Sequence, residues 1–117
     1  MGKTKHLPKQ KLVFETTDCR GYKVVFTQQK LEQKAITHPE LRKPTFVKNV
    51  ERTIREPDEI WQDFGSPKQK ACYYRKYSTV SYIKVVVYTK SNPYTVITAY
   101  EINYIKEAKY PNLKRIR

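Results

Sequence analysis

The chain has 117 residues and a mass of 14.0 kDa, enough for one domain and too little for two that each bury a core. With 24 Lys and Arg against 11 Asp and Glu, its formal net charge is +13, so we expect an anionic partner, and first of all nucleic acid. No apolar stretch approaches the ~20 residues that cross a bilayer, and the first ten residues lack the apolar segment of a secretory signal. We therefore expect a cytoplasmic protein with no membrane partner.

The N-terminal third predicts a basic arm, a hairpin and a short helix. Residues 1–10 hold three lysines without periodicity, which favours a flexible arm. Residues 11–27 alternate around the polar turn at Arg20 and Gly21, as a β-hairpin does. Residues 28–37 are rich in helix formers, and Pro39 disfavours helical geometry at His38, so the helix must end there.

A second helix is predicted over residues 44–56. Phe46, Val50 and Ile54 recur at helical spacing, and Pro57 stops the segment. Beyond it the pattern changes to period two, in four segments separated by short polar turns: residues 59–64, 70–77, 81–90 and 94–102.

These elements predict an α+β fold, with one or two N-terminal helices packed on one face of an antiparallel meander sheet and an additional N-terminal hairpin. The other face of the sheet would remain open for a ligand. We expect a single domain over residues 11–106. Residues 107–117 are basic and predict either a second arm or a final helix broken at Pro111.

Several chemistries are disfavoured by composition. Three glycines without a cluster do not make a phosphate-binding loop, and two Cys and two His at isolated positions do not make a zinc site. The two Cys favour reduced structural thiols. We therefore expect no cofactor and no metal. One alternative stays open, a magnesium-dependent nuclease using Asp58 with Glu107 and Lys109.

Metal-free cleavage of RNA needs a proton acceptor for the 2′-hydroxyl, a proton donor for the leaving oxygen, and cations around the phosphate. His38 is the only histidine inside the predicted domain, and histidine titrates in the range that suits this proton transfer. The alternative is that His38 only caps a helix C-terminus, where a cation is favourable.

The segment 94–100 predicts a strand with two different faces. Alternation places Ile97 and Ala99 on one face and Val96, Thr98 and Tyr100 on the other. If Ile97 and Ala99 face the helices, Thr98 and Tyr100 project from the open face about 7 Å apart at Cα, close enough to contact one nucleotide. Both residue types are also common in half-exposed strands without any such role.

Basic residues alternate with tyrosines in the two preceding strands. Arg75, Lys76 and Lys84 follow this pattern, which is typical of a surface that neutralises phosphates and stacks bases. We therefore predict these three residues as nucleic-acid contacts.

The order of THPEL (37–41), FVKNVERTIREPDEIW (46–61), KVVVY (84–88) and VITAY (96–100) resembles the phage-associated nuclease families of the barnase, EndoU, colicin and RelE-like fold. The resemblance covers about residues 28–106. It implies a metal-independent ribonuclease with a helical layer on an antiparallel sheet, and it implies His38, Thr98 and Tyr100 as catalytic residues. Family segments often carry a basic residue just before this His and another His one turn earlier; this chain has Thr37 and Gln33.

We therefore expect an endoribonuclease, with tRNA among its candidate substrates, acting as a toxin or mobile-element nuclease. Two alternatives remain. The chain is either a catalytically silent basic module that binds RNA or DNA, or a protein-interaction module whose charge complements an acidic partner such as an inhibitor or antitoxin.

Overall fold

A computed structural model describes residues 11–63, 69–105 and 113–117, so the predicted arm at residues 1–10 lies outside the described residues. The elements follow in the order β1 (Leu12–Thr17), β2 (Lys23–Thr27), α1 (Gln28–Lys34), η1 (Pro39–Arg42), α2 (Pro44–Arg55), β3 (Glu59–Asp63), β4 (Lys70–Ser78), β5 (Ser81–Tyr88), β6 (Tyr94–Ile102) and β7 (Leu113–Arg115). η1 is a single 3₁₀ turn.

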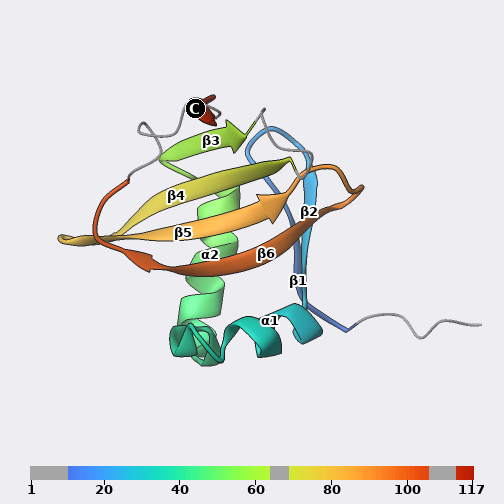
Figure 1. Cartoon of the computed structure of the whole chain (residues 1–117), viewed down its shortest axis with the longest axis vertical. Helices are drawn as coiled ribbons and strands as arrows, with labels where there is room; N and C mark the ends of the chain where they lie inside the picture. Colours follow the sequence, from blue (N-terminus) through green and yellow to red (C-terminus); the bar gives the residue numbers. More distant parts are fainter. Residues whose placement is uncertain (1–10, 64–68, 106–112) are drawn as a thin grey trace, which may run out of the picture.

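The strands form one seven-stranded sheet in the order β1-β2-β6-β5-β4-β3-β7. Neighbouring strands are antiparallel except β2 and β6, which run parallel. Figure 1 shows α2 behind β4 and β5, with α1 beside the edge of β6. The predicted α+β architecture is confirmed, including the N-terminal hairpin and the β3–β6 meander.

The helix α2 supplies much of the core. Phe46, Val50 and Ile54 recur every four residues, which puts them on one stripe, and each is at least 98% buried. Burying each of these side chains contributes about 1.5–3 kcal/mol. Pro44 occupies the first turn, where its missing N–H costs nothing, and Pro57 prevents continuation beyond Arg55.

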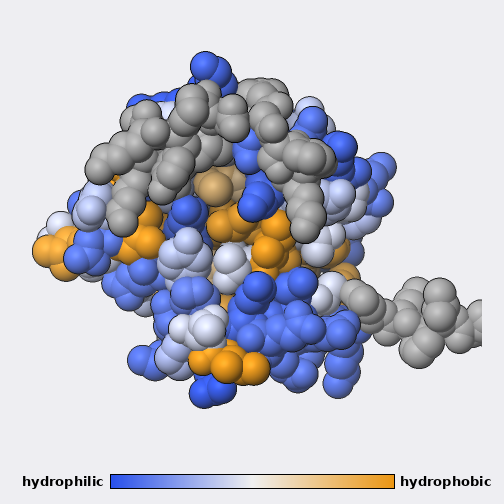
Figure 2. Space-filling view, in the orientation of Figure 1, coloured by the Kyte–Doolittle hydropathy of each residue, from blue (hydrophilic) through white to orange (hydrophobic). Residues whose placement is uncertain are grey.

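The opposing layer comes from alternate residues of β5. Ile83, Val85 and Val87 are buried against the helices, whereas Tyr82, Lys84, Val86 and Tyr88 are half-buried on the other face. Figure 2 looks onto that other face, where apolar side chains gather over β5 and β6 and hydrophilic ones surround them. The sheet therefore has one face in the core and one face that the two helices leave uncovered.

The turn between β1 and β2 is organised by Asp18. Its Oδ1 accepts hydrogen bonds from the backbone N–H groups of Arg20 and Tyr22, both at 2.9 Å. Gly21 adopts φ 95°, a left-handed conformation that favours glycine. These contacts fix the conformation of the turn between β1 and β2.

The C-terminal residues differ from both expected forms. Residues 113–115 form β7, which pairs with β3 through Asp63, Gln62 and Trp61, rather than an arm or a broken helix. Residues 106–112 lie outside the described part. None of the helices in the described ranges has the length and apolar character needed to span a membrane.

Candidate active site

The strand β6 carries Thr98 and Tyr100 on the uncovered face of the sheet. Thr98 pairs with Val86 of β5, and Tyr100 pairs with Lys84 of the same strand. Val86 and Lys84 both point away from the helices. Because directly paired residues of neighbouring strands share a face, these four side chains form one patch.

A bulge in β6 changes the expected alternation. The register shifts between Val86 and Val87, so that Val96 pairs with Val87 on the helix-facing side. Val96 is fully buried in the core, and the expectation that it shares the face of Thr98 is wrong. Ile97, at the bulge, is only half-buried. The extra residue leaves Thr98 and Tyr100 on the uncovered face all the same.

His38 lies against Tyr100. The two ring centroids are 4.4 Å apart and the ring planes differ by 10°, which is a stacked arrangement. The backbone places His38 there because its N–H donates to the Lys34 carbonyl at the end of α1 and its own carbonyl accepts from Leu41 N–H in η1. Within the described ranges neither imidazole nitrogen makes a hydrogen bond, so both are available to a ligand.

A second contact joins the same two segments. Glu40 Oε2 accepts a hydrogen bond from the backbone N–H of Glu101 at 3.3 Å. β2 pairs with β6 only at Tyr94 and Thr95, so the later part of that edge is not paired with β2. η1 thus binds the edge of β6 immediately beside the His38–Tyr100 stack. The sequence analysis did not single out Glu40 for this contact.

Lys84 is the positively charged residue of this patch. Its Nζ lies 5.9 Å from the ring centroid of Tyr100 and 5.7 Å from that of Tyr74, a fully buried neighbour on β4. These are cation–π distances, at which the electron-rich ring faces stabilise an ammonium group. Lys84 therefore brings a cation beside the aromatic pair.

The other two predicted contacts lie elsewhere. Lys76 shares the uncovered face, because it pairs with Tyr82 and its Nζ lies 4.8 Å from that ring, but it is at the outer end of the sheet. Arg75 pairs with the core residue Ile83 and faces the helix side. Its charge contributes, after the hydrogen bond and charge of Arg52, to lowering the pKa of Glu56 at the end of α2. The structure brings Lys84, but not Arg75, to His38, Thr98 and Tyr100.

The hydroxyl of Thr98 is an unusual feature of this patch. Its Oγ1 is buried and has no hydrogen-bond partner within the described residues. Most buried polar groups are paired, and leaving one unpaired costs about 1–3 kcal/mol. An oxygen retained at such a cost is a candidate for a contact with a ligand.

Of the three residues of the carboxylate alternative, only Asp58 lies within the described residues. Asp58 Oδ2 accepts the backbone N–H of Lys76 at 2.7 Å, which gives it a structural role at the start of β3. Glu107 and Lys109 lie outside the described part. In residues 11–63, 69–105 and 113–117, no cluster of His, Cys, Asp and Glu has the composition to hold a metal ion.

Comparison with known families identifies the family to which the chain belongs. The profile of the phage-Barnase-EndoU-ColicinE5/D-RelE like nuclease2 family matches residues 4–117. No curated protein and no solved structure matches the chain. The match extends over nearly the whole sequence, beyond the segments that suggested a resemblance. The chain therefore belongs to this phage Barnase–EndoU–ColicinE5/D–RelE-like family of nucleases, whose substrate is nucleic acid.

Proposed function

We propose that the protein is a metal-independent endoribonuclease that cuts RNA by attack of a ribose 2′-hydroxyl on the adjacent phosphate. The observation that carries the proposal is the stack of His38 on Tyr100, which joins the only described histidine to a phenol from a distant strand. Lys84 and Thr98 lie on the same face, so an acid–base pair is flanked by a cation and a hydroxyl.

The proposed reaction uses this set as follows. His38 accepts the proton of the 2′-hydroxyl while the O2′–P bond forms, giving a 2′,3′-cyclic phosphate. The P–O5′ bond breaks, and the leaving oxygen takes a proton from the Tyr100 hydroxyl. His38 covers one face of the Tyr100 ring, so that face cannot stack on a base. The Tyr100 hydroxyl stays at the edge of the ring, and we therefore assign Tyr100 to proton donation.

Lys84 and Thr98 have supporting roles in the proposal. The Lys84 ammonium stabilises the negative charge that builds up on the phosphate oxygens during attack. Rotation of the Thr98 side chain about its Cα–Cβ bond would turn its unpaired hydroxyl toward a phosphate oxygen. Lys76, farther out on the same face, would contact a neighbouring phosphate of the strand.

The net charge of +13 supports two finer elements of the proposal. It suits a folded, highly charged RNA such as tRNA as substrate. It also suits an acidic protein inhibitor, which would keep a toxin or mobile-element nuclease silent until release.

Cleavage in excess EDTA tests the proposal. Purified protein is incubated with total RNA and with tRNA, and products are resolved on gels and tested for cyclic phosphate ends. Cleavage should persist without metal, and His38→Ala should slow it by about 100-fold or more, as expected for loss of an acid–base group. Tyr100→Phe should slow it while preserving the stack.

Tyr82→Phe is the matched control, because it removes one phenol hydroxyl from the same face beside Lys76. It should cleave at the parent rate. An unchanged rate in folded His38→Ala protein, free of contaminating nuclease, would rule out the assigned mechanism. A parent protein that binds RNA and cuts none would favour the non-catalytic binding module.

A further inference from the structure

A cleft lies at the opposite end of β6 from Tyr100, where the turn between β1 and β2 meets the ends of β3 and β5. Its volume is about 420 Å³, within the usual range of small-ligand sites. The residues that line it include Arg20, Tyr22, Gln62, Gln69, Thr89 and Tyr94. Tyr94 and Tyr100 are about 20 Å apart along the strand, so this cleft is separate from the proposed active site.

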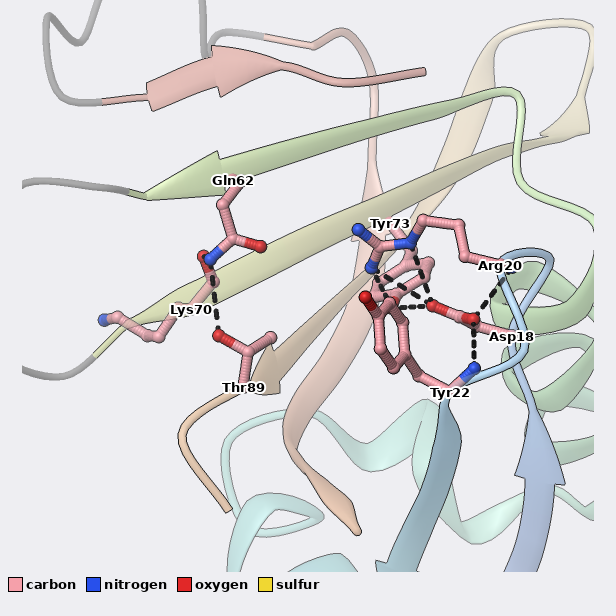
Figure 3. Close-up of polar contacts among 7 residues, drawn as sticks. All are labelled: Asp18, Arg20, Tyr22, Gln62, Lys70, Tyr73 and Thr89. Atoms are coloured by element: carbon pink, nitrogen blue, oxygen red, sulfur yellow. Dashed lines mark hydrogen bonds and ion pairs between the residues drawn. The ribbon is translucent and has the colours of Figure 1, made fainter. Parts of the chain in front are cut away.

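Arg20 is held in place on one side of the cleft. Its Nε and Nη2 donate to Asp18 Oδ2 at 3.2 and 3.1 Å, and Nη2 also donates to the Tyr73 hydroxyl at 3.1 Å. The Asp18 side chain is fully buried, whereas that of Arg20 is 30% exposed. Figure 3 shows the guanidinium anchored by these contacts. Its Nη1 makes no hydrogen bond among the described residues and remains a donor for a ligand.

Gln62 offers an acceptor on the other side. Its Nε2 donates to the Lys70 carbonyl at 3.2 Å and to Thr89 Oγ1 at 3.3 Å, and Thr89 in turn donates to the Gln69 carbonyl. These contacts fix which end of the amide is the oxygen. Gln62 is 8% exposed, and its Oε1 has no partner in the part of the chain that the structure describes. Figure 3 shows this oxygen directed toward the side on which Arg20 lies.

The cleft also has an aromatic wall. The rings of Tyr22 and Tyr94 are stacked with centroids 5.0 Å apart and planes inclined by 27°. The Arg20 guanidinium lies 5.0 Å from the Tyr22 ring centroid, which restrains both groups. Tyr22 is 48% exposed, so its ring remains accessible.

We propose that this cleft binds one unpaired nucleobase of the substrate strand, outside the catalytic site. A phosphate offers only acceptors and would face the Gln62 oxygen unfavourably, whereas the edge of a base carries an N–H for Gln62 and an acceptor for Arg20. The tyrosine rings provide the stacking that single-stranded RNA uses on its protein partners. This proposal rests on the nucleic-acid substrate proposed above.

Binding measured in the absence of cleavage tests it. The probes are four 2′-O-methyl octanucleotides, oligo-A, -C, -G and -U, which lack the attacking hydroxyl, and the parent is His38→Ala protein. In this background Tyr22→Leu should lower the affinity for the octanucleotides that bind by about five-fold or more. A loss of about five-fold is the lower end of what removal of a stacking ring costs. Gln62→Met should change the order of preference among the four bases, which a merely structural defect would not do.

Tyr77→Leu is the control, because this exposed tyrosine lies at the other end of β4 and should leave affinity within two-fold. Affinities and base preference that match the parent in folded Tyr22→Leu and Gln62→Met proteins would overturn the proposal. Because the assay does not require cleavage, a failed ribonuclease test and a failed cleft test are distinguishable.

Discussion

The carboxylate of Glu40 accepts the backbone N–H of Glu101, one residue beyond the tyrosine on which His38 stacks. The contact joins the 3₁₀ turn η1 to the edge of β6. Glu40 lies two residues after His38, and Glu101 lies one residue after Tyr100. Backbone and ring contacts therefore hold the same pair of segments together.

We expect Glu40→Ala to lower the rate of RNA cleavage several-fold, because the His38 ring would lose part of its support over Tyr100. Glu40→Gln keeps an acceptor oxygen and should restore most of the rate. The midpoint of thermal unfolding should change little in either variant, because this hydrogen bond is exposed. Equal rates in the Ala and Gln variants would show that the hydrogen bond does not position the site.

Thr98→Val should separate stability from activity. The substitution replaces a buried, unpaired hydroxyl with a methyl group of similar size, so it should stabilise the fold by about 1–3 kcal/mol and raise Tm by about 4–12 °C. If the hydroxyl contacts the phosphate, cleavage should slow in the same protein. Calorimetry and the EDTA cleavage assay measure the two effects. A Val variant that is less stable than the parent would contradict the unpaired state of the hydroxyl.

The strand pattern was enough to predict that Thr98 and Tyr100 share the uncovered face, but not that Val96 turns into the core. Alternation is a local property of a strand, whereas the bulge opposite Val86 and Val87 depends on how β5 and β6 pair. The same alternation already implies that Arg75 and Lys76, as neighbours in one strand, face opposite ways. Arg75 and Lys76 therefore cannot both contact a ligand bound on one face of the sheet.

The contacts made by η1 and β7 had no local signal. Glu40 follows a histidine and a proline in the sequence, but its partner is a backbone N–H on a distant strand edge. β7 is only three residues long, and its place in the sheet is fixed by pairing with β3. Both depend on tertiary structure that neither periodicity nor residue propensity encodes.

Lys84→Met should weaken binding of RNA by a similar factor for every sequence, since a phosphate contact carries no base information. The slope of the logarithm of affinity against the logarithm of salt concentration should fall by about one, the contribution of one neutralised phosphate. Lys48→Met, on the exposed side of α2, is the matched control and should keep the parent slope. Filter binding with 2′-O-methyl RNA over a range of salt concentrations provides the measurement. An unchanged slope would remove Lys84 from the phosphate-binding surface.

Tyr73 should make the stability of the protein depend on alkaline pH. Its hydroxyl donates to the buried Asp18 Oδ2 at 2.7 Å, and burial followed by the Asp18 carboxylate raises the pKa of Tyr73 above its ordinary value. A raised pKa in the folded state means that the neutral phenol stabilises the fold fully below about pH 10, and that this stabilisation is lost as pH rises further. Tyr73→Phe should cost about 1–3 kcal/mol near neutral pH, because Asp18 loses one donor while buried.

The difference in free energy of unfolding between parent and Tyr73→Phe should therefore narrow as pH rises above about 10, because the Tyr73 phenol, which must stay protonated in the folded state, is present only in the parent. Urea denaturation followed by fluorescence, from about pH 8 to about pH 11, measures this difference. Tyr82→Phe is the control, since its half-buried ring lies outside the Asp18 cluster, and its difference from the parent should stay constant. A constant difference for Tyr73→Phe over the same range would mean that the hydrogen bond from the Tyr73 hydroxyl to Asp18 does not stabilise the fold.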